Sequence, residues 1–208
     1  MVKKLIIFDC YGTLLTKPKG EAYKKLFNTI GLKMKNHYKS IITKKDNDWS
    51  VFVDFDKITK ETYDTAIRDF EIDIENENSD IKPYLENMQE YLTVLREQYT
   101  VVILSNLSDG YAKPITDHLA SYVDKVFYSY DIEEMKPNLN SFLIVKKWFV
   151  ENFGEIDHRH ILVIDDSAKN IQSANSINML GINVNNGNLN SPHSIKSFFE
   201  WTLHMEIS

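Results

Sequence analysis

Several polar residues directly follow short apolar runs, at the places where strands of a parallel sheet would end. They are Asp9 after residues 5–8, Ser105 and Asn106 after residues 101–104, and Asp165 and Asp166 after residues 161–164. Lys136, in a Met-Lys-Pro turn between the last two groups, adds a cation. Because the carboxyl ends of parallel strands share one edge of a sheet, we expect these side chains to converge. A carboxylate nucleophile, a hydroxyl, a cation and metal-binding carboxylates are the groups that phosphoryl transfer uses.

The elements that must position these residues can be predicted from the hydrophobic pattern. Apolar runs bounded by turn-forming residues predict buried strands at residues 5–8, 101–104, 161–164 and 182–184, and a fifth strand at 125–128. Between the strands, apolar residues recur with helical spacing, as in residues 84–95 and 142–149. Strands alternating with helices predict an α/β fold with a doubly wound, Rossmann-like parallel sheet.

Residues 17–80 break this alternation, because helical spacing replaces the strand pattern there. We predict a small inserted helical cap over 17–80, and an α/β core domain made of residues 1–16 and 81–208. The stretch 71–80, rich in Asp, Glu and Asn, predicts an exposed return to the core. A polar loop at 185–192 and a last amphipathic helix, carrying Ile195, Phe198, Phe199 and Leu203, complete the predicted core.

Composition limits the classes of partner. Acidic residues outnumber basic ones by 30 to 24 and no basic stripe is visible, so we expect no nucleic-acid partner. No apolar run approaches membrane-spanning length, and the first one is too short for a signal peptide, so we expect a cytoplasmic protein without a membrane partner. The single cysteine, Cys10, cannot form an internal disulfide, and we interpret it as a small buried residue.

The order and context of the polar residues resemble the haloacid dehalogenase superfamily and its helical-cap branch. The resemblance rests on four motifs: the FDCYGTL segment at residues 8–14, Ser105 with Asn106, Lys136 before a proline, and Asp165-Asp166-Ser167 followed by Asn170. It implies that Asp9 attacks the substrate to form a covalent aspartyl intermediate. It also implies that Ser105 hydrogen-bonds the transferring group and that Lys136 neutralises charge on the nucleophile.

The same resemblance implies a magnesium site and a set of substrate contacts. Asp9, Asp165, Asp166 and the backbone carbonyl of Tyr11 are expected to hold Mg²⁺, and carboxylates also favour a hard cation on physical grounds. Thr13 is expected to help hold the geometry of the nucleophile. Thr13, Tyr11 and Asn106 are our predicted substrate-binding residues.

The residue at position 11 bears on whether the protein is a phosphatase or a dehalogenase. Phosphatases of this superfamily usually carry a second Asp two residues after the nucleophile, as general acid and then base, whereas this chain has Tyr11. A phenol of pKa about 10 is a weaker acid than a carboxylic acid. General acid–base help is worth about two to four orders of magnitude in rate, chiefly with poor leaving groups. A tyrosine at position 11 resembles the pattern of the L-2-haloacid dehalogenases, in which the halide leaves without taking up a proton.

Two other features favour a phosphatase over a dehalogenase. Dehalogenases of this kind work without metal and lack the acidic pair, which this chain keeps as Asp165 and Asp166. They also use an arginine early in the cap, and the arginines here are Arg68, Arg96 and Arg159. We therefore predict a magnesium-dependent phosphatase acting on a small phosphorylated metabolite, with a dehalogenase as the second hypothesis. A catalytically weak regulatory protein that binds a phosphorylated ligand is the third.

Overall fold

The computed structural model describes residues 4–45 and 48–184, which build one five-stranded parallel sheet. The strands are β1 (Leu5–Phe8), β2 (Thr100–Ser105), β3 (Lys125–Tyr128), β4 (Ile161–Asp165) and β5 (Leu180–Asn183). Their order across the sheet is β3-β2-β1-β4-β5, and every neighbouring pair is parallel. The order runs outward in both directions from β1, as in a doubly wound sheet. The predicted Rossmann-like fold is thus confirmed.

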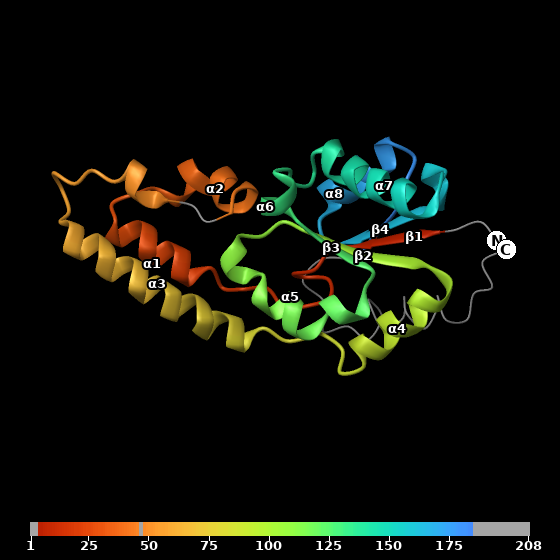
Figure 1. Cartoon of the computed structure of the whole chain (residues 1–208), viewed down its shortest axis with the longest axis horizontal. Helices are drawn as coiled ribbons and strands as arrows, with labels where there is room; N and C mark the ends of the chain where they lie inside the picture. Colours follow the sequence, from red (N-terminus) through yellow and green to blue (C-terminus); the bar gives the residue numbers. More distant parts are fainter. Residues whose placement is uncertain (1–3, 46–47, 185–208) are drawn as a thin grey trace.

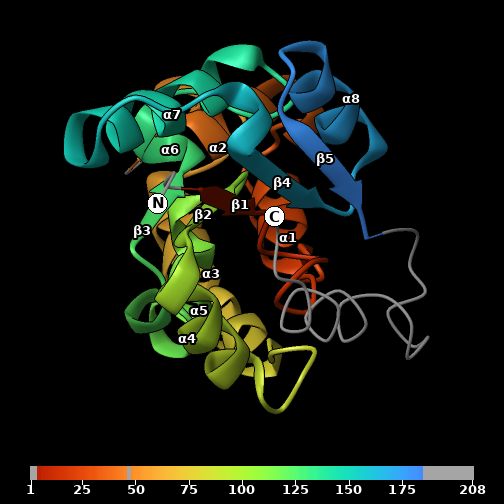
Figure 2. The ribbon, with the colours of Figure 1, turned by 90° about the vertical axis from the view of Figure 1, so that its right-hand side faces the viewer.

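Helices cover both faces of this sheet (Figures 1 and 2). α7 (Leu139–Phe153) and α8 (Ala168–Ser176) lie on one face, and α4 (Met88–Gln98) and α5 (Lys113–His118) lie on the other. α6 (Ser129–Ile132) leads from β3 toward α7. Three 3-10 turns, η2 (Asp109–Tyr111), η3 (Ala120–Tyr122) and η4 (His158–His160), complete the core connections.

Alternate residues of β1 pack into two different apolar clusters, because successive side chains of a strand point to opposite faces. Leu5 and Ile7 join a cluster that contains Phe142, Val145 and Phe149 of α7. Ile6 and Phe8 join the other cluster, with Met88, Leu92 and Leu95 of α4. Burial on both faces explains why the central strands are continuous apolar runs rather than alternating ones.

The chain between β1 and α4 is helical, as predicted. It forms α1 (Glu21–Thr29), α2 (Met34–Thr43), η1 (Trp49–Phe52) and α3 (Lys60–Asp80). α1 packs along α3, and this lobe extends away from the sheet in Figure 1. The prediction that residues 71–80 form an exposed connection back to the core is wrong in one respect. These residues are helical, because α3 continues to Asp80 with Ile74 buried. The division into a cap at 17–80 and a core of 1–16 and 81–208 stays a prediction.

The last strand is displaced from its predicted place. β5 begins at Leu180, opposite Leu162 of β4, so it lies about two residues earlier than the predicted 182–184. The loop predicted at 185–192 and the helix predicted around Ile195 to Leu203 lie outside the described residues. Within residues 4–45 and 48–184, no helix combines the length and apolar character needed to cross a membrane.

Candidate active site

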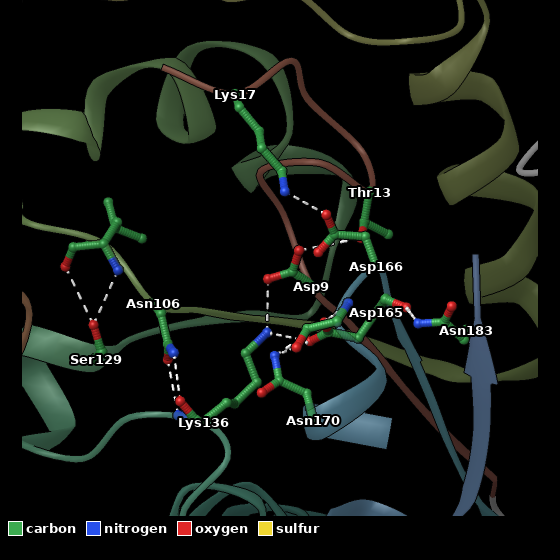
Figure 3. A network of polar contacts seen from close by, with 12 residues as sticks. Asp9, Thr13, Lys17, Asn106, Ser129, Lys136, Asp165, Asp166, Asn170 and Asn183 are labelled. Atoms are coloured by element: carbon green, nitrogen blue, oxygen red, sulfur yellow. Dashed lines mark hydrogen bonds and ion pairs between the residues drawn. The ribbon is translucent and has the colours of Figure 1, made fainter. Parts of the chain in front are cut away.

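The carboxyl ends of the three central strands meet at one edge of the sheet, and the predicted polar residues gather there (Figure 3). Asp9 follows β1, Ser105 ends β2 and Asp165 ends β4. β1 pairs with β2 on one side and with β4 on the other. The Asp9 N–H donates to the Ile164 carbonyl at 2.8 Å. The strand register therefore fixes the position of the nucleophile candidate beside the acidic pair.

Three carboxylates and two ammonium groups form the centre of this site. Asp9, Asp165 and Asp166 each place one carboxylate oxygen within 4.8 Å of the others. Lys136 Nζ lies 2.6 Å from Asp9 Oδ1 and 2.7 Å from Asp165 Oδ2. Lys17 Nζ lies 2.5 Å from Asp166 Oδ2. Like charges at this spacing are unfavourable unless cations lie between them, and the lysines meet that requirement.

Burial sets the ionisation of the innermost groups. Burial raises the pKa of Asp9 to about 6, although Lys136 acts in the opposite direction. Burial alone would lower the pKa of Lys136, but Asp9 and Asp165 outweigh it and the pKa of this ammonium is raised. Lys136, with its side chain only 2% exposed, therefore stays a cation beside the nucleophile. The arrangement suits stabilisation of negative charge on a group that reacts with Asp9.

The backbone of Lys136 is held by the side-chain amide of Asn106. Asn106 Nδ2 donates to the Lys136 carbonyl at 2.7 Å, and Asn106 Oδ1 accepts from the Lys136 N–H at 2.9 Å. The Leu107 N–H donates to Ser129 Oγ at 3.0 Å, which ties the same loop to α6. Asn106 thus positions the lysine, and its predicted contact with a substrate stays a prediction.

Asp165 is fixed by several donors at the start of α8. Asn170 Nδ2 lies 3.0 Å and 2.9 Å from the two carboxylate oxygens of Asp165, and the Ser167 N–H donates to Oδ1 at 2.8 Å. Asn183 Nδ2 in β5 donates to the backbone carbonyl of Asp165 at 3.2 Å (Figure 3). The fourth motif contained Ser167 and Asn170, whereas no sequence pattern indicated Asn183.

The two hydroxyl residues of the motifs differ in their contacts. Thr13 Oγ1 donates to Asp9 Oδ2 at 3.1 Å, and its predicted contact with a substrate stays a prediction. Ser105 Oγ is buried and has no hydrogen-bond partner among the described residues. A buried hydroxyl without a partner is costly to the folded protein, so a ligand that accepts its hydrogen bond is favoured.

Tyr11 uses its phenol for a contact outside the carboxylate cluster. Its hydroxyl donates to the backbone carbonyl of Tyr111 at 2.5 Å. Burial raises the pKa of this phenol far above its usual value. The Tyr111 hydroxyl in turn donates to Glu77 Oε2 in α3 at 2.8 Å. The Tyr11 proton is therefore engaged in a contact that links the loop after β1 to η2, and it is a poor source of a proton for a leaving group.

Sequence reasoning missed Lys17, which reaches the cluster from the segment that follows the FDCYGTL motif. The contact depends on Gly12, which has φ of +96° and lies directly beneath the lysine stem. A Cβ atom at Gly12 would lie 2.2 Å from Lys17 Cε and 2.5 Å from Asp166 Oδ2. The glycine in the motif was the available signal for a close approach, but it did not indicate which side chain would use the space.

The family is identified by a model of the haloacid dehalogenase-like hydrolases, which matches residues 3–178. The chain belongs to this family of hydrolases. The motif residues that carried the resemblance lie inside the matched range. A comparison with curated proteins gave no match.

Solved structures share the fold at low sequence identity. A predicted HAD-like hydrolase from Porphyromonas gingivalis is 19% identical, with a TM-score of 0.65, covering 99% of this chain and 100% of that one. A HAD family enzyme from Bacteroides thetaiotaomicron, solved with magnesium and inorganic phosphate, is 21% identical (TM-score 0.55; 86% and 93% covered). A 2-haloacid dehalogenase from Pseudomonas syringae is 15% identical (TM-score 0.61; 98% and 99% covered). These likenesses confirm the α/β fold.

Proposed function

We propose that this hydrolase is a magnesium-dependent phosphatase that uses Asp9 as its nucleophile on a small phosphorylated metabolite. The observation that carries the proposal is the cluster of Asp9, Asp165 and Asp166, whose carboxylate oxygens lie within 4.8 Å of one another. A donor set made only of oxygen fits Mg²⁺, and the backbone carbonyl of Tyr11 would complete it. When bound, the cation would orient the phosphoryl group and offset its negative charge.

The side chains of the site suit a two-step reaction. An oxygen of Asp9 forms a bond to phosphorus while the bond to the leaving oxygen breaks, and the leaving oxygen keeps the electron pair and takes a proton from water. The ammonium of Lys136 and the hydroxyl of Ser105 stabilise the charge on the phosphoryl oxygens. Water then attacks the phosphorus of the aspartyl phosphate, which releases inorganic phosphate and restores the Asp9 carboxylate.

The nucleophile and the metal are tested together with one matched control. Asp9→Asn is expected to abolish turnover of para-nitrophenyl phosphate, and EDTA is expected to stop the unmodified protein until Mg²⁺ is returned. Asp117→Asn, an exposed aspartate of α5, should keep full activity. Turnover that persists in EDTA would contradict the phosphatase proposal.

The engaged phenol of Tyr11 predicts a preference for good leaving groups, because no carboxylic acid stands at this position. We expect para-nitrophenyl phosphate and acetyl phosphate to be hydrolysed far faster than glycerol 3-phosphate. Tyr11→Asp should narrow this gap, while Tyr11→Phe, which adds no acid, should leave it unchanged. Equal rates on all three substrates in the unmodified protein would show that another group supplies the proton.

A dehalogenase is the second candidate, favoured by Tyr11 and consistent with the likeness to the Pseudomonas syringae structure. The likeness to the magnesium and phosphate complex from Bacteroides thetaiotaomicron supports the phosphatase instead. Halide release from L-2-chloropropionate without added metal would replace our proposal with this one. Tight binding of a phosphorylated metabolite without turnover of either substrate would favour a regulatory protein.

We also propose a cytoplasmic location and a small molecule as the partner, rather than nucleic acid or a membrane. The net charge of −6 and the lack of a basic stripe in the sequence argue against nucleic acid as the partner.

A further inference from the structure

The two lysines of the site differ in how firmly they are held. Lys136 is buried and bridges Asp9 and Asp165, so it cannot leave without abandoning two buried carboxylates. The side chain of Lys17 is 60% exposed, and that of its partner Asp166 is 21% exposed. An exposed ammonium can move into water at little cost, because water solvates it well and exposed ion pairs are weak.

The backbone that carries Lys17 is nevertheless well placed. The preceding residue, Thr16, donates its N–H to the Lys82 carbonyl at 2.9 Å, and its Oγ1 accepts from the Lys82 N–H at 3.0 Å. These bonds join the two chain segments that connect the helical lobe to the sheet. Gly12 leaves the space through which the lysine stem reaches Asp166. A hydrogen-bonded segment and a long side chain thus bring the ammonium to the carboxylate, and Figure 3 shows the resulting Lys17–Asp166 contact.

We propose that Lys17 competes with Mg²⁺ for the carboxylate of Asp166 and so weakens the affinity of the site for the metal. This inference rests on the proposed function. The ammonium of Lys17 lies 2.5 Å from Asp166 Oδ2, and the same carboxylate belongs to the cluster that would hold magnesium. The ammonium of Lys17 and a magnesium ion on the same carboxylate would repel each other. Metal binding therefore displaces Lys17, whereas Lys136 remains.

The test measures Mg²⁺ binding directly, by isothermal titration of the full-length protein without substrate. Lys17→Met is expected to bind Mg²⁺ about two- to fivefold more tightly than the unmodified protein, as suits an ion pair of this exposure. Lys17→Arg keeps the charge and the reach, so its affinity should stay near the original value. Added KCl should narrow the difference between Lys17→Met and the unmodified protein.

Lys19→Met is the matched control, because Lys19 lies two residues further along the same segment. Its side chain is 69% exposed and it pairs with Asp80 at 2.9 Å, outside the carboxylate cluster. The control removes the same unit of charge, so it shows how much of the change is long-range electrostatics. Its Mg²⁺ affinity should stay close to the original, changing by clearly less than the roughly twofold that is the smallest gain expected for Lys17→Met.

The outcomes separate this inference from the proposed function. Equal affinities for Lys17→Met and Lys19→Met, or weaker binding by Lys17→Met, would overturn the competition while leaving a metal-dependent phosphatase intact. If neither the unmodified protein nor any folded variant binds Mg²⁺, the proposed function fails and the inference fails with it. Circular dichroism of each variant confirms that the fold is retained.

Discussion

Two parts of the described structure stabilise carboxylates in contrasting surroundings: the edge of the sheet, and the place where α1, α3 and η2 meet. At the sheet edge, Asp9 and Asp165 are buried and share the buried ammonium of Lys136. In the second region the half-buried Glu77 of α3 forms no ion pair within residues 4–45 and 48–184, although the exposed ammonium of Lys19 attracts it at longer range. Its hydrogen-bond donors are neutral groups, whereas those of Asp9 and Asp165 include a buried ammonium, so the two regions stabilise negative charge in different ways.

The neutral donors around Glu77 are mostly groups that a helix leaves unpaired at its start. Glu77 Oε2 accepts from the Gly20 N–H at 2.9 Å, and Oε1 accepts from the Ala22 N–H at 2.6 Å. The Tyr111 hydroxyl adds a third bond at 2.8 Å. A carboxylate at a helix N-terminus accepts hydrogen bonds from the unpaired backbone N–H groups, and its negative charge interacts favourably with the helix dipole. This second region joins the lobe to the core, whereas the first concentrates charge at the edge of the sheet.

Removing the ammonium from the sheet edge should have the largest effect. Lys136→Met leaves Asp9 and Asp165 buried without a cation, which is expected to lower the free energy of unfolding by about 3–5 kcal/mol in EDTA at neutral pH. Urea unfolding followed by circular dichroism measures it. Lys147→Met, on the exposed side of α7, serves as control and should change little. A loss under about 1 kcal/mol would show that the sheet-edge charges are not coupled as described.

Acidification should affect the sheet edge through Asp9, whose pKa is raised to about 6. Below that pH Asp9 gains a proton and ceases to be a nucleophile, so activity at low Mg²⁺ should fall as pH decreases through about 6. Saturating Mg²⁺ should move the midpoint of this pH–rate profile to lower pH, because the cation competes with the proton for Asp9.

The free energy of unfolding should change with pH in the opposite direction to activity. Between about pH 4 and 6 native Asp9 binds a proton that the unfolded chain does not, so this group alone stabilises the fold as pH falls. A pH–rate midpoint that is independent of Mg²⁺ would contradict the assignment.

Removing the carboxylate of the second region should cost less and act differently. Glu77→Ala leaves the N–H groups of Gly20 and Ala22 without their acceptor, so we expect a loss of about 1–3 kcal/mol in unfolding free energy. KM should rise more than kcat falls, because the change disturbs the lobe rather than the reacting groups. Glu71→Ala, at an exposed position of the same helix, is the control. A kcat loss as large as that of Lys136→Met would erase the distinction between the regions.

The smallest effect is expected at the contact that connects the two regions. Tyr11→Phe removes the hydrogen bond to the Tyr111 carbonyl and should lower the unfolding free energy by about 0.5–1.5 kcal/mol. Its kcat on para-nitrophenyl phosphate should stay within about threefold of the original, since general acid help would be worth a hundredfold or more. A hundredfold loss of kcat would show that the phenol does take part in proton transfer.

The sheet and its edge could be predicted because buried parallel strands leave a strong local pattern. The run at residues 5–8 coincides with β1, Asp9 directly follows it, and Asp165 ends β4, as the apolar runs predicted. The end of α3 was harder, since the polar stretch 71–80 reads as a loop until the burial of Ile74 against the lobe is known. Local propensity was overridden there by tertiary packing.

The contacts that could not be predicted join residues far apart in the sequence. The Tyr11 hydroxyl and the Tyr111 carbonyl are 100 residues apart, and Lys17 meets Asp166 only because a glycine admits its stem. No periodicity or motif encodes such pairs, because each depends on the relative placement of elements. The motif residues are positioned by strand ends, whereas these partners are positioned by the fold as a whole.

The unpaired hydroxyl of Ser105 has a consequence for turnover. If it donates to the transferring group, the same donor also meets the inorganic phosphate that the reaction leaves behind. The product then accepts the hydrogen bond that no residue in 4–45 or 48–184 accepts, so its departure restores an unfavourable state. Release of phosphate, rather than a chemical step, would then limit the rate of turnover. The melting temperature of the protein would also be higher with phosphate bound than without it.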